Sequence, residues 1–318
     1  MAPKFKNRRV FCGGLGAGFI AFTTFRGTVA RPWKVSEEGR FAKNNIVGTI
    51  RFHISKKEDT LLDLARFNKL GFVEIVAANR GIDPWLPGPG KKIILPTAHL
   101  LPDGPRKGLL LNLVDQRLYY FSENNEKVKS FPIGTGQDAW GTPLGSTQVI
   151  RKKKNPIWFV PKSIRKEQPE LPKVILPGPD NPLGQHALYL GWESYLIHGT
   201  NIPWGVGRRV SHGCIRMYPE DISWLFSRVT LGTPVTVVSQ ELKLGWVKNQ
   251  LLIEIHPNPK QNEELEHTGK FSSAKVPEMV YRIAQAAGGK VKKVDWKKVK
   301  KAEAERTGLP VSVLTNGY

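Results

Sequence analysis

Short apolar runs separated by turn residues occupy the middle of the chain and predict a series of β-strands. A turn at Asp115-Gln116 joins the first two runs and predicts a hairpin. Many short strands with turns between them favour two packed sheets, so we predict a mainly β domain of sandwich topology over residues 105–239. The predicted strands lie at 109–114, 117–121, 128–133, 146–150, 187–191, 195–198 and 234–238.

A smaller segment, residues 49–97, has a mixed pattern that predicts a strand, two helices and a second strand. Asp59-Thr60 supplies the N-cap of the first helix, and a turn rich in Pro and Gly precedes the last strand. The segment is therefore expected to form a small α+β module. Its predicted elements are a strand at 50–54, a helix from Asp59-Thr60, a helix at 72–79 and a strand at 92–95.

The two flanking segments carry weaker patterns. Residues 31–48 are polar and predict a linker, whereas residues 240–318 form an extension in which helices are predicted near 280–287 and 296–304. No chemistry is evident in this extension, and its role stays open.

Residues 1–30 have the organisation of an export signal. A basic start is followed by an apolar, glycine-rich run from Val10 to Phe25 and by small residues ending at Ala30, where cleavage is expected. A membrane anchor is the alternative, but the run is shorter than the roughly 20 apolar residues that a span needs. Arg8-Arg9 resembles the twin-arginine export pattern, so the export route stays open.

Composition narrows the possible partners. At 318 residues, with 40% hydrophobic residues and nine Trp, the chain is long enough for two or three globular domains. Its formal net charge of +21 favours an anionic partner, such as nucleic acid, anionic lipid or a carboxylate-rich polymer. Export makes nucleic acid an improbable partner. Cleavage removes five basic and no acidic residues, which leaves 21 − 5 = +16 on the mature chain.

Cleavage also removes Cys12, so Cys214 becomes the one cysteine of the mature chain. An unpaired thiol is a liability in an oxidising compartment, and this argues that it is used. Cys214 lies shortly before a helix that Pro219 is expected to open, with Arg216 nearby in sequence, and both features favour the thiolate. His198 ends an apolar strand and is followed by Gly199, so it is the natural base for a nucleophilic cysteine.

Two other interpretations of these residues remain at this point. Cys214 can be a small buried hydrophobe, with His198 and His212 as hydrogen-bonded core groups. A metal site built from the same three residues is a poor choice, since neither paired cysteines nor an HExxH spacing is present. We therefore predict no metal and no cofactor.

The motifs His198-Gly199-Thr200 and Ser211-His212-Gly213-Cys214 closely resemble the signature of the YkuD-type L,D-transpeptidases, which have a β-sandwich fold. The resemblance extends from 109 to 239 and includes the runs PIGTG and TPLG. The family signature commonly has Asn at the position of Arg216. An Arg there resembles the subgroup that attaches an outer-membrane lipoprotein to the wall. Residues 49–97 resemble a LysM module, which binds glycan.

The resemblance implies a role for each residue of the motifs. Cys214 would attack the bond between diaminopimelate and D-Ala of a peptidoglycan stem, with His198 as base and the Gly199 carbonyl orienting the imidazole. Backbone N–H groups at Gly213 and Cys214 would hold the oxyanion. The same stretch supplies the other candidates for oxyanion and substrate binding, which are Ser211, His212 and Arg216.

The resemblance predicts a periplasmic, wall-associated enzyme that carbapenems acylate and that uses stem peptides and glycan as partners. The acyl acceptor stays open between a second stem, an outer-membrane lipoprotein and water, the last giving a carboxypeptidase. A wall-degrading cysteine peptidase of the NlpC type is disfavoured, because its Cys precedes its His. The non-enzyme alternative is a LysM-anchored structural wall protein. The sequence leaves the oligomeric state open.

Overall fold

A computed structural model describes residues 45–122, 127–137 and 141–315. The predicted export signal and most of the predicted linker lie outside these residues. Within the described ranges, no helix is both long and apolar enough to cross a membrane.

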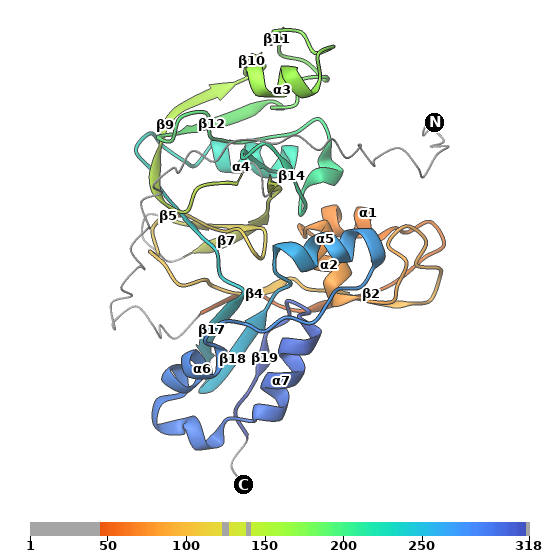
Figure 1. The fold of residues 1–318 in the computed structure, drawn as a ribbon, viewed down its shortest axis with the longest axis vertical. Coiled ribbons are helices and arrows are strands. Elements are labelled where there is room, and N and C mark those ends of the chain that lie inside the picture. Colours follow the sequence, from red (N-terminus) through yellow and green to blue (C-terminus); the bar gives the residue numbers. More distant parts are fainter. Residues whose placement is uncertain (1–44, 123–126, 138–140, 316–318) are drawn as a thin grey trace, which may run out of the picture. The chain divides into compact units, whose positions relative to one another are not determined.

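The middle of the chain is built on one eight-stranded sheet, in the order β15-β13-β12-β9-β16-β5-β6-β7, of which β5, β7, β9 and β12 are labelled in Figure 1. The pairs β13–β15 and β16–β5 are parallel, and the other neighbours are antiparallel. The strands are β5 (Gly108–Asn112), β6 (Arg117–Phe121), β7 (Val128–Pro132), β9 (Gly145–Lys154), β12 (His186–Leu190), β13 (Leu196–His198), β15 (Ile215–Arg216) and β16 (Pro234–Val238).

The prediction of a mainly β domain is confirmed, but the sheet is continuous where two packed sheets were expected. Strand β9 is the reason, because it is ten residues long. Its first part, from Gly145 to Gln148, pairs with β16, and its second part, from Val149 to Lys154, pairs with β12. The one strand thus joins both halves of the sheet, and a bulge between Tyr189 and Leu190 changes the register there.

A buried apolar core packs between the sheet and helix α4 (Pro219–Phe226). Ile222 and Leu225 of α4 lie in this core together with Ile197 of β13 and Ile215 of β15. Sequence patterns did not predict the shorter elements around it. These are β8 (Thr135–Gly136), β10 (Trp158–Phe159), α3 (Lys162–Glu167), β11 (Val174–Ile175), the 3-10 helix η3 (Pro203–Gly205) and β14 (Arg209–Ser211).

The smaller module has the predicted order of strand, helix, helix and strand. Thr60 caps α1 by accepting a hydrogen bond from the Asp63 N–H at 3.0 Å. Leu265 of α5 (Pro259–Thr268) joins the module's apolar core from far along the chain. The module consists of β2 (Arg51–Ile54), α1 (Leu61–Phe67), α2 (Phe72–Ala78) and β3 (Lys92–Leu95), and β1 (Ile46–Gly48) and β4 (Ala98–Leu100) form a two-stranded sheet beside it.

The C-terminal extension is a folded unit with its own apolar core. The two predicted helices are present, but a three-stranded sheet was missed. Its hairpin turns at Lys248-Asn249, both with positive φ, and this turn contains no glycine to signal it. The elements are β17 (Leu242–Val247), β18 (Gln250–Ile255), α6 (Met279–Ala287), the 3-10 helix η4 (Gly288–Lys293), α7 (Trp296–Glu305) and β19 (Val311–Ser312).

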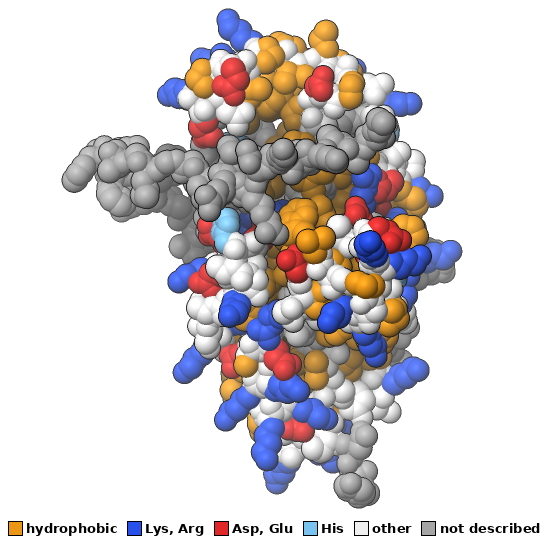
Figure 2. Space-filling view, turned by 90° about the vertical axis from the view of Figure 1, so that its right-hand side faces the viewer, with side chains coloured by type: hydrophobic (Ala, Val, Ile, Leu, Met, Phe, Trp, Pro, Cys, Tyr) orange, Lys and Arg blue, Asp and Glu red, His pale blue; other side chains and the backbone are white. Residues whose placement is uncertain are grey.

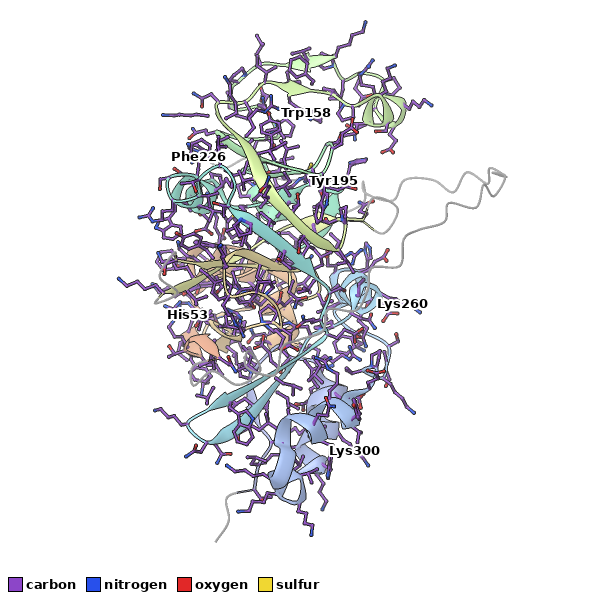
Figure 3. All side chains as sticks on the ribbon, turned by 90° about the vertical axis from the view of Figure 1, so that its left-hand side faces the viewer. His53, Trp158, Tyr195, Phe226, Lys260 and Lys300 are labelled. Carbon is purple, nitrogen blue, oxygen red and sulfur yellow. The ribbon has the colours of Figure 1, made fainter. Side chains whose placement is uncertain are left out.

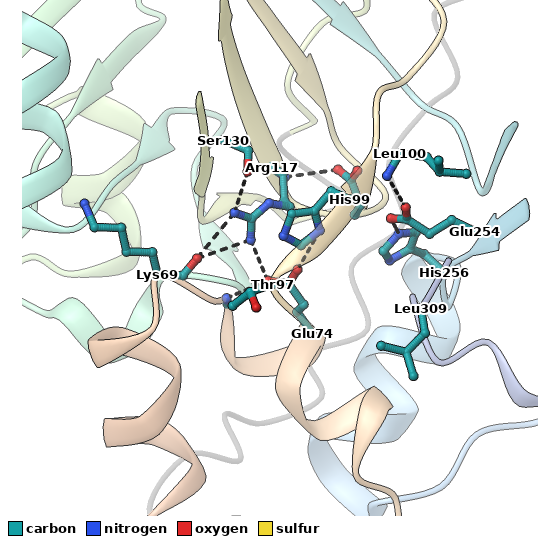
Figure 4. Close-up of polar contacts among 12 residues, drawn as sticks. Lys69, Glu74, Thr97, His99, Leu100, Arg117, Ser130, Glu254, His256 and Leu309 are labelled. Carbon is teal, nitrogen blue, oxygen red and sulfur yellow. Dashed lines mark hydrogen bonds and ion pairs between the residues drawn. The ribbon is translucent and has the colours of Figure 1, made fainter. Parts of the chain in front are cut away.

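Buried charges join the extension to the eight-stranded sheet. The Lys243 ammonium lies 2.7 Å from Asp115 Oδ2 and 2.5 Å from Glu254 Oε1, and all three side chains are fully buried. Glu254 also accepts a hydrogen bond from the Leu100 N–H and lies 2.6 Å from His256 Nε2 (Figure 4). Asp115, Glu254 and His256 are close enough together to hold a metal ion. Because the Lys243 ammonium already contacts both carboxylates, we interpret this cluster as an ion-pair network.

A second buried cluster joins the small module to the sheet. Arg117 of β6 donates to Glu74 Oε2 of α2 at 2.7 Å and to Ser130 Oγ at 3.0 Å (Figure 4). His99 lies 3.3 Å from the same glutamate, but burial and the Arg117 charge hold its pKa well below the usual value. His99 is therefore neutral, and the ion pair of this cluster is Arg117 with Glu74.

Candidate active site

The parallel pairing of β13 and β15 brings the predicted reactive residues together. Ile197 is opposite Ile215, and both are buried in the core. His198 is opposite Arg216 on the other face of the two strands, since side chains alternate along a strand. Cys214 directly precedes Ile215 and so shares the face of His198 and Arg216.

His198 is held as a neutral imidazole with a defined tautomer. Its Nδ1 lies 2.6 Å from the carbonyl oxygen of Gly199, which can only accept, so Nδ1 carries the proton. Burial, followed by the nearby Arg216 charge, lowers the pKa of His198 to about 3. Nε2 is consequently left as a proton acceptor at neutral pH.

The environment of Cys214 differs from the one that the sequence predicted. Helix α4 begins only at Pro219, and strand β15 lies between it and Cys214 in the chain, so the cysteine does not lie at the helix terminus. Burial raises the pKa of Cys214, although a backbone hydrogen bond from Leu196 and the Arg216 charge oppose this. The expectation of a favoured thiolate was wrong, and the resting form is a thiol beside a neutral imidazole.

The thiol and the imidazole are not joined by a hydrogen bond, although both lie in described parts of the chain. The Sγ atom instead donates a weak hydrogen bond to the Ser194 carbonyl at 3.5 Å. Catalytic hydrogen bonds are often long in unliganded enzymes and tighten when substrate binds. The arrangement is therefore compatible with proton transfer in a substrate complex.

Two side-chain hydrogen bonds fix the backbone around Cys214. Ser211 Oγ donates to the Cys214 carbonyl at 2.6 Å, and Thr142 Oγ1 donates to the Gly213 carbonyl at 2.8 Å. Gly213 has φ of +99°, a conformation that side chains disfavour. His212 points to the insertion between β9 and β12, where its Nε2 lies 2.9 Å from Glu167 of α3.

Sequence reasoning missed three residues that support the site. Thr142 lies in the TPLG run, which carried the family resemblance but no assigned role. Glu167 lies in a helix too short to be predicted from periodicity. Tyr195, labelled in Figure 3, donates from its hydroxyl to the Gly141 carbonyl at 3.2 Å. No local signal identifies such contacts, because each joins segments that are distant in sequence.

We expect the alkylation of Cys214 by iodoacetamide to rise with pH through a midpoint above about 8.5, the usual thiol value. The reason is that burial raises the pKa of this thiol, and the neutral His198 cannot supply an imidazolium partner. The measurement is the second-order alkylation rate at each pH, with the unfolded protein as reference. A plateau of reactivity extending below about pH 7 would show a thiolate–imidazolium pair instead.

The fold and this thiol–imidazole arrangement fit a cysteine acyltransferase, and comparison with known proteins gives the family. Residues 106–237 match the family of the YkuD L,D-transpeptidase catalytic domain. The chain is 36% identical over 255 residues to the probable L,D-transpeptidase YcfS of Escherichia coli K12, covering 75% of this chain and 78% of YcfS. The chain therefore belongs to the L,D-transpeptidase family.

Other proteins of the same kind are also similar. The probable L,D-transpeptidase YbiS of Escherichia coli K12 is 36% identical over 249 residues, covering 76% of this chain and 79% of YbiS. Among solved structures, an L,D-transpeptidase from Mycobacterium smegmatis is 22% identical, with a TM-score of 0.32 over 45% of this chain and 62% of that one.

Proposed function

We propose that the chain is a peptidoglycan L,D-transpeptidase with Cys214 as nucleophile and His198 as general base. The observation that carries this assignment is the hydrogen bond from His198 Nδ1 to Gly199, which leaves Nε2 free on the strand face shared with Cys214. Most buried polar atoms in proteins have a hydrogen-bond partner, so an unpaired Nε2 on this face favours a role in proton transfer.

In the acylation step, the Cys214 sulfur attacks the carbonyl carbon between diaminopimelate and D-Ala while the thiol proton passes to His198 Nε2. A carbon–sulfur bond forms, and the carbonyl becomes an oxyanion. When the oxyanion collapses, the carbon–nitrogen bond breaks, and the D-Ala amine leaves with the proton from His198. The enzyme is left as a thioester with His198 neutral again.

In the second step, an acceptor amine attacks the thioester, and His198 takes its proton. Collapse of this second oxyanion breaks the carbon–sulfur bond and returns the proton to Cys214. A neutral His198 suits both steps, because it must accept a proton at the start of each one. Water in place of the amine would make the reaction a carboxypeptidase reaction.

The oxyanion and the substrate carboxylate need separate partners. We assign the oxyanion to the backbone N–H groups of Gly213 and Cys214, whose geometry Ser211 and Thr142 maintain through the two neighbouring carbonyls. Arg216 is suited to a substrate carboxylate, since a guanidinium binds carboxylates through two parallel hydrogen bonds. His212 contacts Glu167 and would shape the pocket from the side of the insertion.

The proposal extends to the identity of the acyl acceptor. We infer an amine, either on a second stem or on the terminal Lys of an outer-membrane lipoprotein, because Arg216 replaces the more common Asn. Purified protein is incubated with a disaccharide-tetrapeptide, alone or with a peptide ending in Lys, and products are read by mass spectrometry. Release of D-Ala with a new amide supports transfer, whereas D-Ala release without any new amide means hydrolysis.

We further propose that the chain is exported to the periplasm and that residues 49–97 form a LysM-like module that holds it on glycan. The catalytic domain would extend over 105–239. Trp85 supports the glycan role, because it is 48% exposed beside Leu86 in the Pro- and Gly-rich turn. Lys and Arg side chains are scattered over the surface in Figure 2 and would add a general attraction to the anionic wall.

We expect Trp85→Ala to lower the fraction of protein that sediments with purified sacculi, because an exposed aromatic ring is a stacking surface for a sugar. Tyr281→Ala is the control, since Tyr281 is 61% exposed on α6, outside the module. Binding is measured at low and raised salt, since exposed charges are screened within about 10 Å at 0.1 M. Unchanged binding of Trp85→Ala, together with complete release by salt, would assign wall binding to charge alone.

A further inference from the structure

The small module and the catalytic domain meet at two glycines. A Cβ atom added to Gly71, which precedes α2, would lie 2.7 Å from the Cα of Gly207, and one added to Gly207 would lie 2.2 Å from the Cα of Gly71. Such distances are shorter than real Cβ contacts allow. The two backbones can therefore approach this closely only because both residues are glycine.

The N-terminus of α2 binds the backbone of the catalytic domain at the same place. The first N–H groups of a helix have no partner within the helix. Here the Phe72 N–H donates to the Val206 carbonyl at 3.4 Å, and the Val73 N–H donates to the Gly207 carbonyl at 3.1 Å. The segment of residues 203–208, which we call the pre-catalytic loop, thus supplies the partners that α2 lacks.

Side chains strengthen this contact. The Arg208 guanidinium lies 3.7 Å from the centroid of the Phe72 ring, within the range of a cation–π interaction. Its Nη1 donates to Glu266 of α5 at 3.3 Å, and α5 also packs into the core of the module. Arg208 is therefore held between the module and a helix of the C-terminal extension.

The pre-catalytic loop leads directly into the candidate active site. Within this loop, the Gly207 N–H donates to the Ile133 carbonyl. The Arg208 carbonyl accepts a hydrogen bond from the Thr135 N–H at 3.0 Å. The chain then pairs as β14 with β8, up to Ser211. Ser211 is the residue whose hydroxyl holds the Cys214 carbonyl, so a shift of the loop would be passed on to Cys214.

We propose that the N-terminus of α2 positions the Cys214 loop, with Gly71, Phe72 and Arg208 as positioning residues. The small module then has a role in catalysis on soluble substrates in addition to any glycan binding. The inference rests on the proposed role of Cys214. It also means that deletion of residues 31–97 cannot separate wall binding from catalysis, because the deletion would remove the support of the loop.

The decisive variant is Gly71→Ala. Gly71 has φ of −83°, so alanine adds no backbone strain of its own, and the added methyl group acts only through the contact with Gly207. Gly289→Ala is the matched control, since a Cβ at Gly289 meets nothing within 4 Å. Measurements are kcat and KM with a soluble muropeptide, the alkylation rate of Cys214 and the melting temperature.

We expect Gly71→Ala to lower kcat by roughly tenfold or more with little change in KM, since a misplacement of about 1 Å can cost about 100-fold. The alkylation rate of Cys214 should change as well, whereas Gly289→Ala should behave as wild type in all measurements. Wild-type kcat and alkylation in a folded Gly71→Ala protein would overturn the proposal, as would an equal loss in Gly289→Ala.

Arg208→Ala tests the proposal if Gly71→Ala does not fold. It too should lower kcat with little change in KM and should change the alkylation rate of Cys214. Arg208→Lys should recover part of kcat, because lysine keeps the charge beside Phe72 and Glu266 but loses the planar stacking. If Arg208→Ala changes neither kcat nor the alkylation rate of Cys214, the proposal is overturned. If wild-type protein turns over no muropeptide, the proposed function fails, but the alkylation rates still test the positioning of Cys214.

Discussion

Cys214→Ala is expected to abolish acyl transfer while leaving the fold almost unchanged. Removal of a catalytic nucleophile lowers turnover by at least about 10³-fold in comparable enzymes. The cost in stability should stay below about 1 kcal/mol, because the half-buried sulfur makes only weak hydrogen bonds, to the Ser194 carbonyl and from the Leu196 backbone. The measurements are D-Ala release from a tetrapeptide muropeptide and the thermal unfolding of the same preparation.

A covalent probe provides the control for this variant. The thiol should open the lactam ring of a carbapenem, with the sulfur bonded to the carbonyl carbon and the ring nitrogen protonated, giving an adduct of the full mass of the drug. His198→Ala should retain iodoacetamide labelling but lose most of this adduct, because lactam opening needs proton transfer. Retained transfer in Cys214→Ala would refute the assignment, and loss of folding would favour a structural role for the cysteine.

Lys243→Met is expected to destabilise the protein by about 3–5 kcal/mol, which is the usual cost of removing one partner of a buried ion pair. Lys243 is 1% exposed, and its ammonium lies between Asp115 of the catalytic domain and Glu254 of β18. Burial alone would lower the pKa of Lys243, but the two carboxylates outweigh it and raise the pKa. Methionine would leave two carboxylates buried without a counter-charge.

The free energy of unfolding is measured by urea denaturation, with Lys260→Met as the control because the Lys260 side chain is 79% exposed. The additional change Asp115→Asn should restore part of the stability of Lys243→Met by removing one uncompensated charge. A loss below about 1 kcal/mol for Lys243→Met would mean that the C-terminal extension is not held to the catalytic sheet through this ion pair.

The sequence by itself determined seven of the eight strands of the catalytic sheet, all but β15, and the order of elements in the small module. These features follow from local patterns: apolar alternation defines each strand, and Thr60 and Pro219 define where helices begin. The same local patterns indicated His198 at the end of a strand and Cys214 in a separate motif. Each of these inferences needs only a residue and its near neighbours in the chain.

The tertiary structure decided what depends on segments that are distant in sequence. The pKa of Cys214 is raised because the surrounding fold buries the thiol, while the sequence suggested the influence of a helix that in fact begins beyond β15. The β17–β18 hairpin was missed because its Lys248-Asn249 turn contains no glycine, and Lys243 of β17 is buried only because the fold brings Asp115 and Glu254 to it. The contact of Gly71 with Gly207 likewise could not be predicted from the sequence around either glycine. The need for glycine at both positions arises only from the close packing of the two domains.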